Sequence, residues 1–267
     1  MLDQQSRNDL AVTLGTIALG AGQIIMAARA AGAEMSRKVD GSPVTKADLE
    51  ADTLIRSRLA VLFPNIPTVT EECLERPLGS SPPAIFFLVD PLDGTREFTA
   101  GRDEFTVNIA LIKDGQPVAG TIYAPATSRL YVAGGEAFRA DVLPVAPMPR
   151  LCEMKRLSTA PVPPSGLRAV ASRSHLDAAT KSWLEGHNIL ELWPAGSSLK
   201  FCVIAEGEAD VYPRLGPTME WDTAAGQAIL EAAGGCVLDL GGKPLRYGNP
   251  GAEYRNGSFV AWGQAPA

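Results

Sequence analysis

One short stretch constrains this chain more than any other, because an apolar run in it ends abruptly at two aspartates. Residues 85 to 89 read Ile-Phe-Phe-Leu-Val, a run that predicts a buried strand. Asp90 and Asp93 follow, with Gly94 and Thr95 directly behind them. Asp, Pro and Gly are common turn residues, so a simple turn is one interpretation. The other is a ligand site, because α/β proteins place ligands beyond the carboxyl ends of their strands.

Size and charge limit the classes of protein that fit. The 267 residues suit one large domain or two moderate ones, and 46% hydrophobic residues are enough for a sizeable core. The formal net charge is −6 and no basic run is present, which argues against a nucleic-acid partner. An anionic ligand would need local cations or metal ions, because the overall field of the protein repels it.

The cysteines and the first residues bear on the cellular compartment. The four cysteines lie far apart with no Cys/His cluster, which indicates reduced thiols and no zinc site. Residues 1 to 32 show helical apolar spacing interrupted by charges, without the features of a signal peptide. We expect this helix to be too polar to span a bilayer. The prediction is a cytoplasmic protein, with weak peripheral association with the inner membrane left open.

The spacing of apolar residues predicts two different halves. Helices are expected over residues 10–28 and from Thr45 to Pro64, and strands over 84–90, 106–112, 118–124 and 129–134. A proline-rich stretch, residues 143–167, separates these from alternating strands and helices over 167–262. We therefore predict an α+β N-terminal domain over 1–148 and an α/β C-terminal domain over 149–267, whose sheet is partly parallel.

Acidic residues stand at the edges of these predicted elements: Asp48, Glu71, Asp90, Asp93 and Asp222. Each has a structural explanation. Asp48 completes a capping box with Thr45, Glu71 belongs to a solvated pair with Glu72, and Asp222 is the N-cap of a helix. The alternative is a metal site. Carboxylates without His or Cys favour Mg²⁺ or Mn²⁺, and the spacing does not fit an EF-hand. Several such carboxylates with a substrate phosphate would form a site for phosphoryl transfer.

Sequence motifs connect these acids to a known family. "PVTKAD", "EE", "DPLDGTREF" and "WDTAAGQAILEAAGG" resemble, in order and spacing, the signatures of the lithium-sensitive, Mg²⁺-dependent phosphatases of the inositol monophosphatase superfamily. "DEFTVNIALIKDG", "SRSH", "GSSLKF" and "YPRLGPTMEWDTAAG" are similar to the bacterial 3′(2′),5′-bisphosphate nucleotidases. The resemblance covers nearly the whole chain except the proline-rich stretch and the last residues. It implies a layered αβαβα sandwich and a phosphoric monoester hydrolase of sulfate assimilation that removes the 3′-phosphate of adenosine 3′,5′-bisphosphate.

The resemblance also assigns the catalytic centre. The implied metal ligands are Glu71, Asp90, the carbonyl of Leu92, Asp93 and Asp222. The implied catalytic residues are Asp48, Thr95 and Glu71, of which Asp48 and Thr95 position and deprotonate the attacking water. Two to three Mg²⁺ ions are expected as cofactors, with Mn²⁺ able to substitute and Li⁺ inhibitory.

A further set is implied to contact the nucleotide substrate: Gly94, Thr95, Ser172, His175, Gly196, Ser197, Lys200 and Asp222. Lys200 suits the phosphate that is not cleaved, because its ammonium is a compact charge. From the residues alone, His175 is a surface histidine and Ser197 a helix N-cap. Arg173 and Arg214 are further phosphate candidates. Arg96 departs from the family pattern, in which lysine is more usual.

Several alternatives stay open at this stage. An inositol or sugar-phosphate phosphatase would use the same metal site, and a non-catalytic nucleotide-binding regulator would keep the fold without turnover. The motifs do not decide between the bisphosphate and 3′-phosphoadenosine 5′-phosphosulfate as substrates. The expected partner is a small nucleotide, with no nucleic acid and no protein partner evident, and the protein is predicted to be a monomer or a homodimer.

Overall fold

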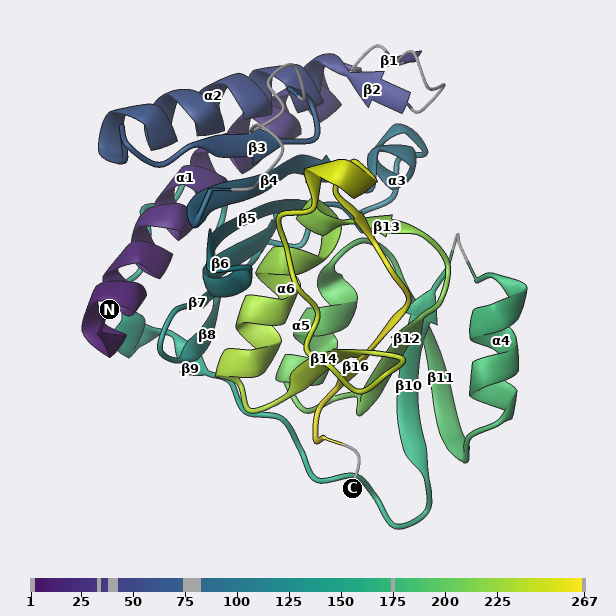
Figure 1. Ribbon diagram of the computed structural model, residues 1–267. Coiled ribbons are helices and arrows are strands. Elements are labelled where there is room, and N and C mark those ends of the chain that lie inside the picture. The colour runs from purple at the N-terminus through teal and green to yellow at the C-terminus, as the bar shows by residue number, and fades with distance from the viewer. Residues whose placement is uncertain (1–2, 33–34, 38–42, 74–82, 174–175, 266–267) are drawn as a thin grey trace.

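Sheets and helices alternate through the computed structural model, which describes residues 3–32, 35–37, 43–73, 83–173 and 176–265. Helices α1 and α2 cover one face of a large sheet, and α5 and α6 cover the other (Figure 1). A second sheet packs on the far side of α5 and α6, with α4 outside it (Figure 1). This order of layers confirms the predicted αβαβα sandwich.

The helices lie mostly where the apolar spacing predicts them. They are α1 (Gln4–Ala30), α2 (Lys46–Leu62), α3 (Thr95–Thr99), α4 (Ala178–Glu185), α5 (Leu199–Ala205) and α6 (Glu220–Ala232), with short 3-10 turns at Leu151–Glu153 and Pro250–Ala252. Thr45 caps α2 and Asp48 completes the predicted capping box. Helix α3, a single turn, was not predicted.

The first sheet has the order β3-β4-β5-β6-β7-β8-β9 and is antiparallel except between β3 and β4. Its strands are β3 (Thr68–Thr70), β4 (Ile85–Asp93), β5 (Thr106–Lys113), β6 (Gln116–Ala124), β7 (Arg129–Ala133), β8 (Ala137–Asp141) and β9 (Lys155–Arg156). Alternate residues of a strand point to opposite faces. Phe87 and Val89 thus pack in the cluster under α1 and α2, and Phe86 and Leu88 in the cluster around α6. The run is apolar throughout because both faces of β4 are buried.

The second sheet has the order β11-β10-β12-β16-β14, and short ribbons join β1 to β2 and β13 to β15. These strands are β1 (Met35–Arg37), β2 (Pro43–Thr45), β10 (Leu167–Ser172), β11 (Ile189–Ala195), β12 (Val211–Arg214), β13 (Thr218–Met219), β14 (Cys236–Asp239), β15 (Arg255–Asn256) and β16 (Phe259–Trp262). The β11-β10-β12 part is parallel and the β12-β16-β14 part antiparallel, so the predicted mixture is confirmed.

The acidic stretch is folded differently from a simple turn. Strand β4 continues through Asp90 to Asp93, and its pairing with β5 shifts register between these two residues. Such an irregularity changes the direction of the side chains around it. Gly94 then adopts a left-handed conformation, with φ of +92°, and a Cβ there would lie 2.9 Å from the carbonyl oxygen of Glu104. Only glycine fits this passage from β4 into α3 without strain.

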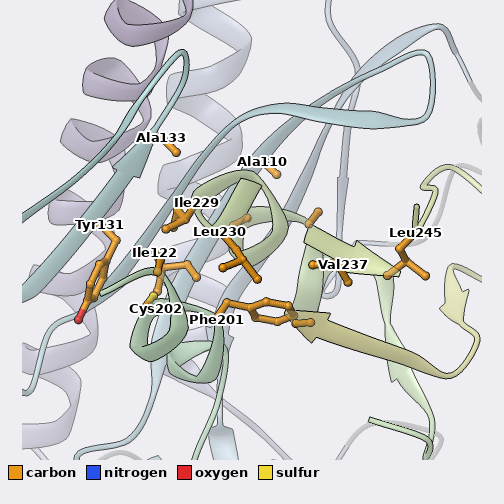
Figure 2. Close-up of a cluster of buried hydrophobic side chains, with 14 of the residues drawn as sticks. Ala110, Ile122, Tyr131, Ala133, Phe201, Cys202, Ile229, Leu230, Val237 and Leu245 are labelled. Atoms are coloured by element: carbon orange, nitrogen blue, oxygen red, sulfur yellow. The ribbon is translucent and has the colours of Figure 1, made fainter. Parts of the chain in front are cut away.

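Helix α6 is the centre of the core that joins the sheets. Figure 2 shows its Ile229 and Leu230 between Ala110 and Ile122 of the first sheet and Phe201 of α5. The same cluster extends to β14, so it contains side chains from both sides of residue 148. Strand β9 also lies beyond that position and pairs with β8. The division into domains at 148 stays a prediction.

Helix α1 is long and apolar enough to cross a membrane by length and composition, so the prediction that it is too polar is wrong. In the structure, 50% of its most apolar window is buried. Its inner face packs on α2, β6 and β7, with Leu14, Ala18 and Ile25 inaccessible to solvent. The core helix of a globular protein passes the same composition test.

A pair of glycines in α1 tests this packing. A Cβ on Gly22 would lie 2.4 Å from Cε1 of Tyr123, whose ring is held by a 2.7 Å hydrogen bond from its hydroxyl to the Val142 carbonyl. We expect Gly22→Ala to lower the free energy of unfolding by about 1–3 kcal/mol, as overpacking does. The matched control is Gly20→Ala, whose Cβ would lie an ordinary 3.5 Å from Leu54.

Because alanine favours helix, the control should stabilise the protein by up to about 1 kcal/mol. Urea unfolding of the variants measures both changes. Equal effects of the two substitutions would contradict the described contact between α1 and Tyr123.

Candidate active site

An open cavity of about 400 Å³ lies where β4, α3, β12 and the N-terminal ends of α5 and α6 meet. The structure brings most of the sequence-predicted site residues to its lining: Glu71, Asp90, Leu92, Asp93, Gly94, Thr95, Ser172, Gly196, Ser197, Lys200 and Asp222. Asp48 is buried behind Thr95, and His175 lies outside the described residues. Arg173 is not part of the lining and forms a 2.8 Å ion pair with Glu104.

Buried carboxylates crowd one end of the cavity. Burial raises the pKa of Asp90 well above its usual value, and the negative charges of Glu71, Asp93 and Asp222 raise it further. The pKa of Asp222 is raised well above its usual value for the same reasons, burial first and then repulsion by Asp93 and Glu71. Carboxylates that repel one another in this way create a strong preference for positive charge between them.

Local hydrogen bonds fix how these carboxylates point. The Leu92 N–H donates to Asp90 Oδ1 at 3.0 Å, and the Met219 N–H donates to Asp222 Oδ2 at 2.9 Å. Asp222 is therefore the third residue of α6, with Met219 at the cap position, so the N-cap interpretation is wrong. In each of these two carboxylates, one oxygen accepts a hydrogen bond from the backbone of a residue nearby in the sequence, which restricts the orientation of the side chain.

Ser198 is a site residue that the sequence analysis missed. Its buried hydroxyl lies 2.7 Å from Asp93 Oδ2 and 2.6 Å from the Asp222 carbonyl oxygen, and it accepts a 2.8 Å hydrogen bond from the Asn108 amide. It precedes α5, so Ser198 and not Ser197 occupies the cap position. The motif "GSSLKF" contains both serines, and only the tertiary structure shows which of them reaches the acids.

Asp48 and Thr95 form a connected pair. Both the N–H and the hydroxyl of Thr45 donate to Asp48 Oδ2, at 2.7 and 2.6 Å. The Thr95 hydroxyl lies 3.0 Å from Asp48 Oδ1 and 3.1 Å from the Leu92 carbonyl oxygen. Burial raises the pKa of Asp48, although the hydrogen bonds from Thr45 and Thr95 oppose this shift. A hydroxyl that donates to a carboxylate keeps its lone pairs available to accept another hydrogen, here on the cavity side.

A buried lysine stands on another wall of the cavity. Lys200 is 5% exposed, and its ammonium donates to the Ser197 carbonyl and lies 5.1 Å from the centre of the Tyr212 ring. Burial lowers its pKa to about 8, against the opposing influence of Asp93. Ser197 has φ of +45°, and its buried hydroxyl has no hydrogen-bond partner within the described residues.

Comparisons with known proteins identify the family of this chain. The model of the inositol monophosphatase family matches residues 6–263. The chain belongs to this family. It is 42% identical over 232 residues to the 3′(2′),5′-bisphosphate nucleotidase CysQ of Escherichia coli strain K12, covering 83% of this chain and 86% of the relative.

Solved structures of the inositol monophosphatase family are similar as well. CysQ of Bacteroides thetaiotaomicron, described as a bacterial member of the family, is 36% identical with a TM-score of 0.81, over 95% of this chain and 97% of that one. An inositol monophosphatase of Thermotoga maritima, at 22% identity and a TM-score of 0.75, covers 96% and 92% and shows the fold alone.

Enzymes of the inositol monophosphatase family are generally metal-dependent, and the donor groups of this cavity fit a hard divalent cation. The donors are carboxylates without imidazole or thiolate, and their mutual repulsion would be relieved by positive charge. In the part of the chain that the structure describes, no three His, Cys, Asp or Glu side chains converge closely enough to hold an ion as they stand. The carboxylates would have to draw together around it, and the predicted ligand set stays a prediction.

The role of Ser198 is testable. Ser198→Ala removes the hydroxyl that holds Asp93, so we expect Mg²⁺ to bind about 10- to 100-fold more weakly, as when other groups that orient a ligand are removed. Isothermal titration calorimetry with Mg²⁺ measures the affinity. Ser182→Ala, on the exposed surface of α4, is the control. An unchanged Mg²⁺ affinity in the Ser198 variant would contradict the assignment.

Proposed function

We propose that this enzyme removes the 3′-phosphate of adenosine 3′,5′-bisphosphate and releases adenosine monophosphate and phosphate. One observation carries the proposal: a single cavity holds a cluster of carboxylates beside a buried lysine. A substrate with two phosphates matches this arrangement, because one phosphate can react at the acidic end while the lysine binds the other. The names of the relatives that are 42% identical support the nucleotide as substrate.

Lys200 is suited to a phosphate that is held and not cleaved. Its ammonium is anchored by the Ser197 carbonyl and the Tyr212 ring, so its position is set before the ligand arrives. Interaction with a phosphate would replace solvation that burial has removed. Ser172, Gly196 and Ser197 line the cavity close by, and we assign them, with His175, to the nucleoside. The Ser197 hydroxyl, which has no hydrogen-bond partner among the described residues, would gain one in such a complex.

We assign Glu71, Asp90, the Leu92 carbonyl, Asp93 and Asp222 to two or three Mg²⁺ ions, with Mn²⁺ able to substitute and Li⁺ as an inhibitor. When bound, Mg²⁺ supplies stabilisation of the developing charge on phosphoryl and leaving-group oxygens. The carboxylates alone would repel the substrate, so they require these counter-charges. We assign the backbone N–H groups of Gly94 and Thr95 to the phosphate that is cleaved.

Water is positioned by Thr95 and Asp48. The Thr95 hydroxyl hydrogen is directed to Asp48 at 3.0 Å, so the Thr95 oxygen can accept a hydrogen from the attacking water. As the water attacks phosphorus, the bond from phosphorus to the 3′-oxygen breaks, a proton of the water passes to Thr95 and the Thr95 proton passes to Asp48. The leaving 3′-oxygen takes a proton from water in the open cavity. The raised pKa of Asp48 makes that carboxylate a better proton acceptor than an exposed aspartate.

We further propose that the enzyme acts in the cytoplasm as part of sulfate assimilation, as a monomer or homodimer, and that 3′-phosphoadenosine 5′-phosphosulfate is a second substrate. Each substrate carries a second anionic group at the position where Lys200 would bind it. The shared feature is therefore a 3′-phosphate to cleave and an acidic group at the 5′ position.

Phosphate release at millimolar Mg²⁺ tests the proposed activity. We expect kcat/KM for adenosine 3′,5′-bisphosphate to exceed that for inositol 1-phosphate by at least about 100-fold, the value of one well-placed charged contact. It should also exceed that for fructose 1,6-bisphosphate, which carries a second phosphate but no nucleoside to contact Ser172, Gly196 and Ser197. A preference for inositol or sugar phosphate would overturn the substrate and leave the mechanism. Nucleotide binding without release of phosphate would indicate a regulator.

Substitution of Thr95 tests the proton path. Thr95→Val keeps the shape of the side chain and removes its hydroxyl, so we expect kcat to fall by about 10²- to 10⁴-fold, as loss of acid–base catalysis does. Thr95→Ser keeps the hydroxyl and should stay within a few-fold of the wild type. Steady-state kinetics with the bisphosphate measures both. Similar kcat values for the valine variant and the wild type would rule out this path.

A further inference from the structure

The ribbon of β13 and β15 forms a wall of the cavity that the proposed mechanism does not use. In this ribbon Met219 pairs with Arg255 and Thr218 with Asn256. Directly opposed residues of an antiparallel pair lie on the same face. Met219 lines the cavity, and so does Arg255 opposite it. The register of the ribbon therefore places a cation, distant in the sequence from the acidic motifs, beside the site.

The backbone at Arg255 is fastened to the start of α6. The Asn256 amide donates to the Met219 carbonyl at 2.8 Å and to the Thr223 hydroxyl at 2.9 Å. The Glu220 N–H donates to the Tyr254 carbonyl at 2.7 Å. The residues on either side of Arg255 are thus tied to the same helix turn that carries Asp222. The backbone of Arg255 therefore keeps a fixed place relative to the acidic cluster.

The Arg255 side chain itself is held weakly. It is 59% exposed, and its Nε lies 3.8 Å from a carboxylate oxygen of Glu253. The Glu253 side chain is 80% exposed. Such a surface pair contributes little energy, because water screens both charges. A ligand with a more concentrated negative charge would compete with Glu253 successfully. The guanidinium can therefore turn toward the cavity without loss of a strong interaction.

Lys200, Arg214 and Arg255 all line this cavity. Lys200 on α5 is 5% exposed, Arg214 ends β12 and donates to the Pro217 carbonyl at 2.8 Å, and Arg255 on the ribbon has a largely exposed side chain. The buried indole N–H of Trp221, which also lines the cavity, has no acceptor within the described residues. An oxygen-rich group bound here would meet both positive charge and a donor that needs an acceptor.

We propose that Arg255 is a specificity-determining residue that binds the uncleaved anionic group of the substrate. Lys200 contacts this group as a point charge, and the planar guanidinium of Arg255 contacts it from the mouth of the cavity with paired N–H donors. The residue thereby favours substrates with two anionic groups over simple phosphate monoesters. The inference rests on the proposed function and adds to it a residue that selects the substrate.

The test compares Arg255→Gln with the wild type on adenosine 3′,5′-bisphosphate and on adenosine 3′-monophosphate, which lacks the second phosphate. We expect the variant to lose about 10- to 100-fold in kcat/KM for the bisphosphate through KM, the usual value of a charged hydrogen bond. Its kinetics on the monophosphate should be unchanged. The control is Lys243→Gln, which also removes one positive charge but at an exposed residue outside this cavity. It should leave kcat/KM for both substrates unchanged.

Binding provides a measurement that does not depend on turnover. In calorimetry with Mg²⁺ present, the Arg255 variant should bind adenosine monophosphate about 10- to 100-fold more weakly than the wild type does. It should bind adenosine, which has no phosphate, with the same affinity as the wild type. Equal losses on both substrates, or no loss on either, would overturn the role of Arg255. A wild-type enzyme without preference for the bisphosphate would instead overturn the proposed function. Thermal unfolding of each variant identifies any loss that comes from misfolding.

Discussion

Repulsion among the carboxylates of Glu71, Asp90, Asp93 and Asp222 is the interaction that the rest of the fold has to oppose. These side chains come from three separate parts of the sequence, and burial makes their negative charges costly to hold together. The large apolar clusters on both faces of the first sheet supply the opposing stabilisation. Because β4 is buried on both faces, its aspartates cannot withdraw into solvent without breaking the sheet.

Helix α6 connects this electrostatic centre to the core. Its first turn carries Asp222, and its later turns place Ile229 and Leu230 in the cluster between the sheets (Figure 2). The helix also approaches the first sheet closely, since a Cβ on Gly120 would lie 3.0 Å from the Cα of Ala225. Close packing of this kind transmits small displacements, so core substitutions far from the cavity should be felt at the acids.

Much of this arrangement could be predicted from the sequence. The apolar runs identified the buried strands, Thr45 and Asp48 identified a helix start, and the motifs named most of the residues that line the cavity. Ser198 was missed because nothing local distinguishes it from Ser197, and their roles follow from φ angles and from the approach of β4. Arg255 was missed because its place depends on the pairing of two-residue strands, which have no periodicity to detect. The slip in register that extends β4 to Asp93 is likewise a tertiary feature.

The strand order of the second sheet has a consequence for how the protein forms. Strand β16 lies between β12 and β14, although it comes later in the sequence than both. During synthesis, the strand that connects β12 to β14 is therefore missing until residues 259–262 have left the ribosome. Pairings between distant segments form slowly, and unpaired edges are prone to wrong association. The first sheet can assemble much earlier, so an incomplete chain would present the aspartates of β4 before the helix that carries Asp222 is in place.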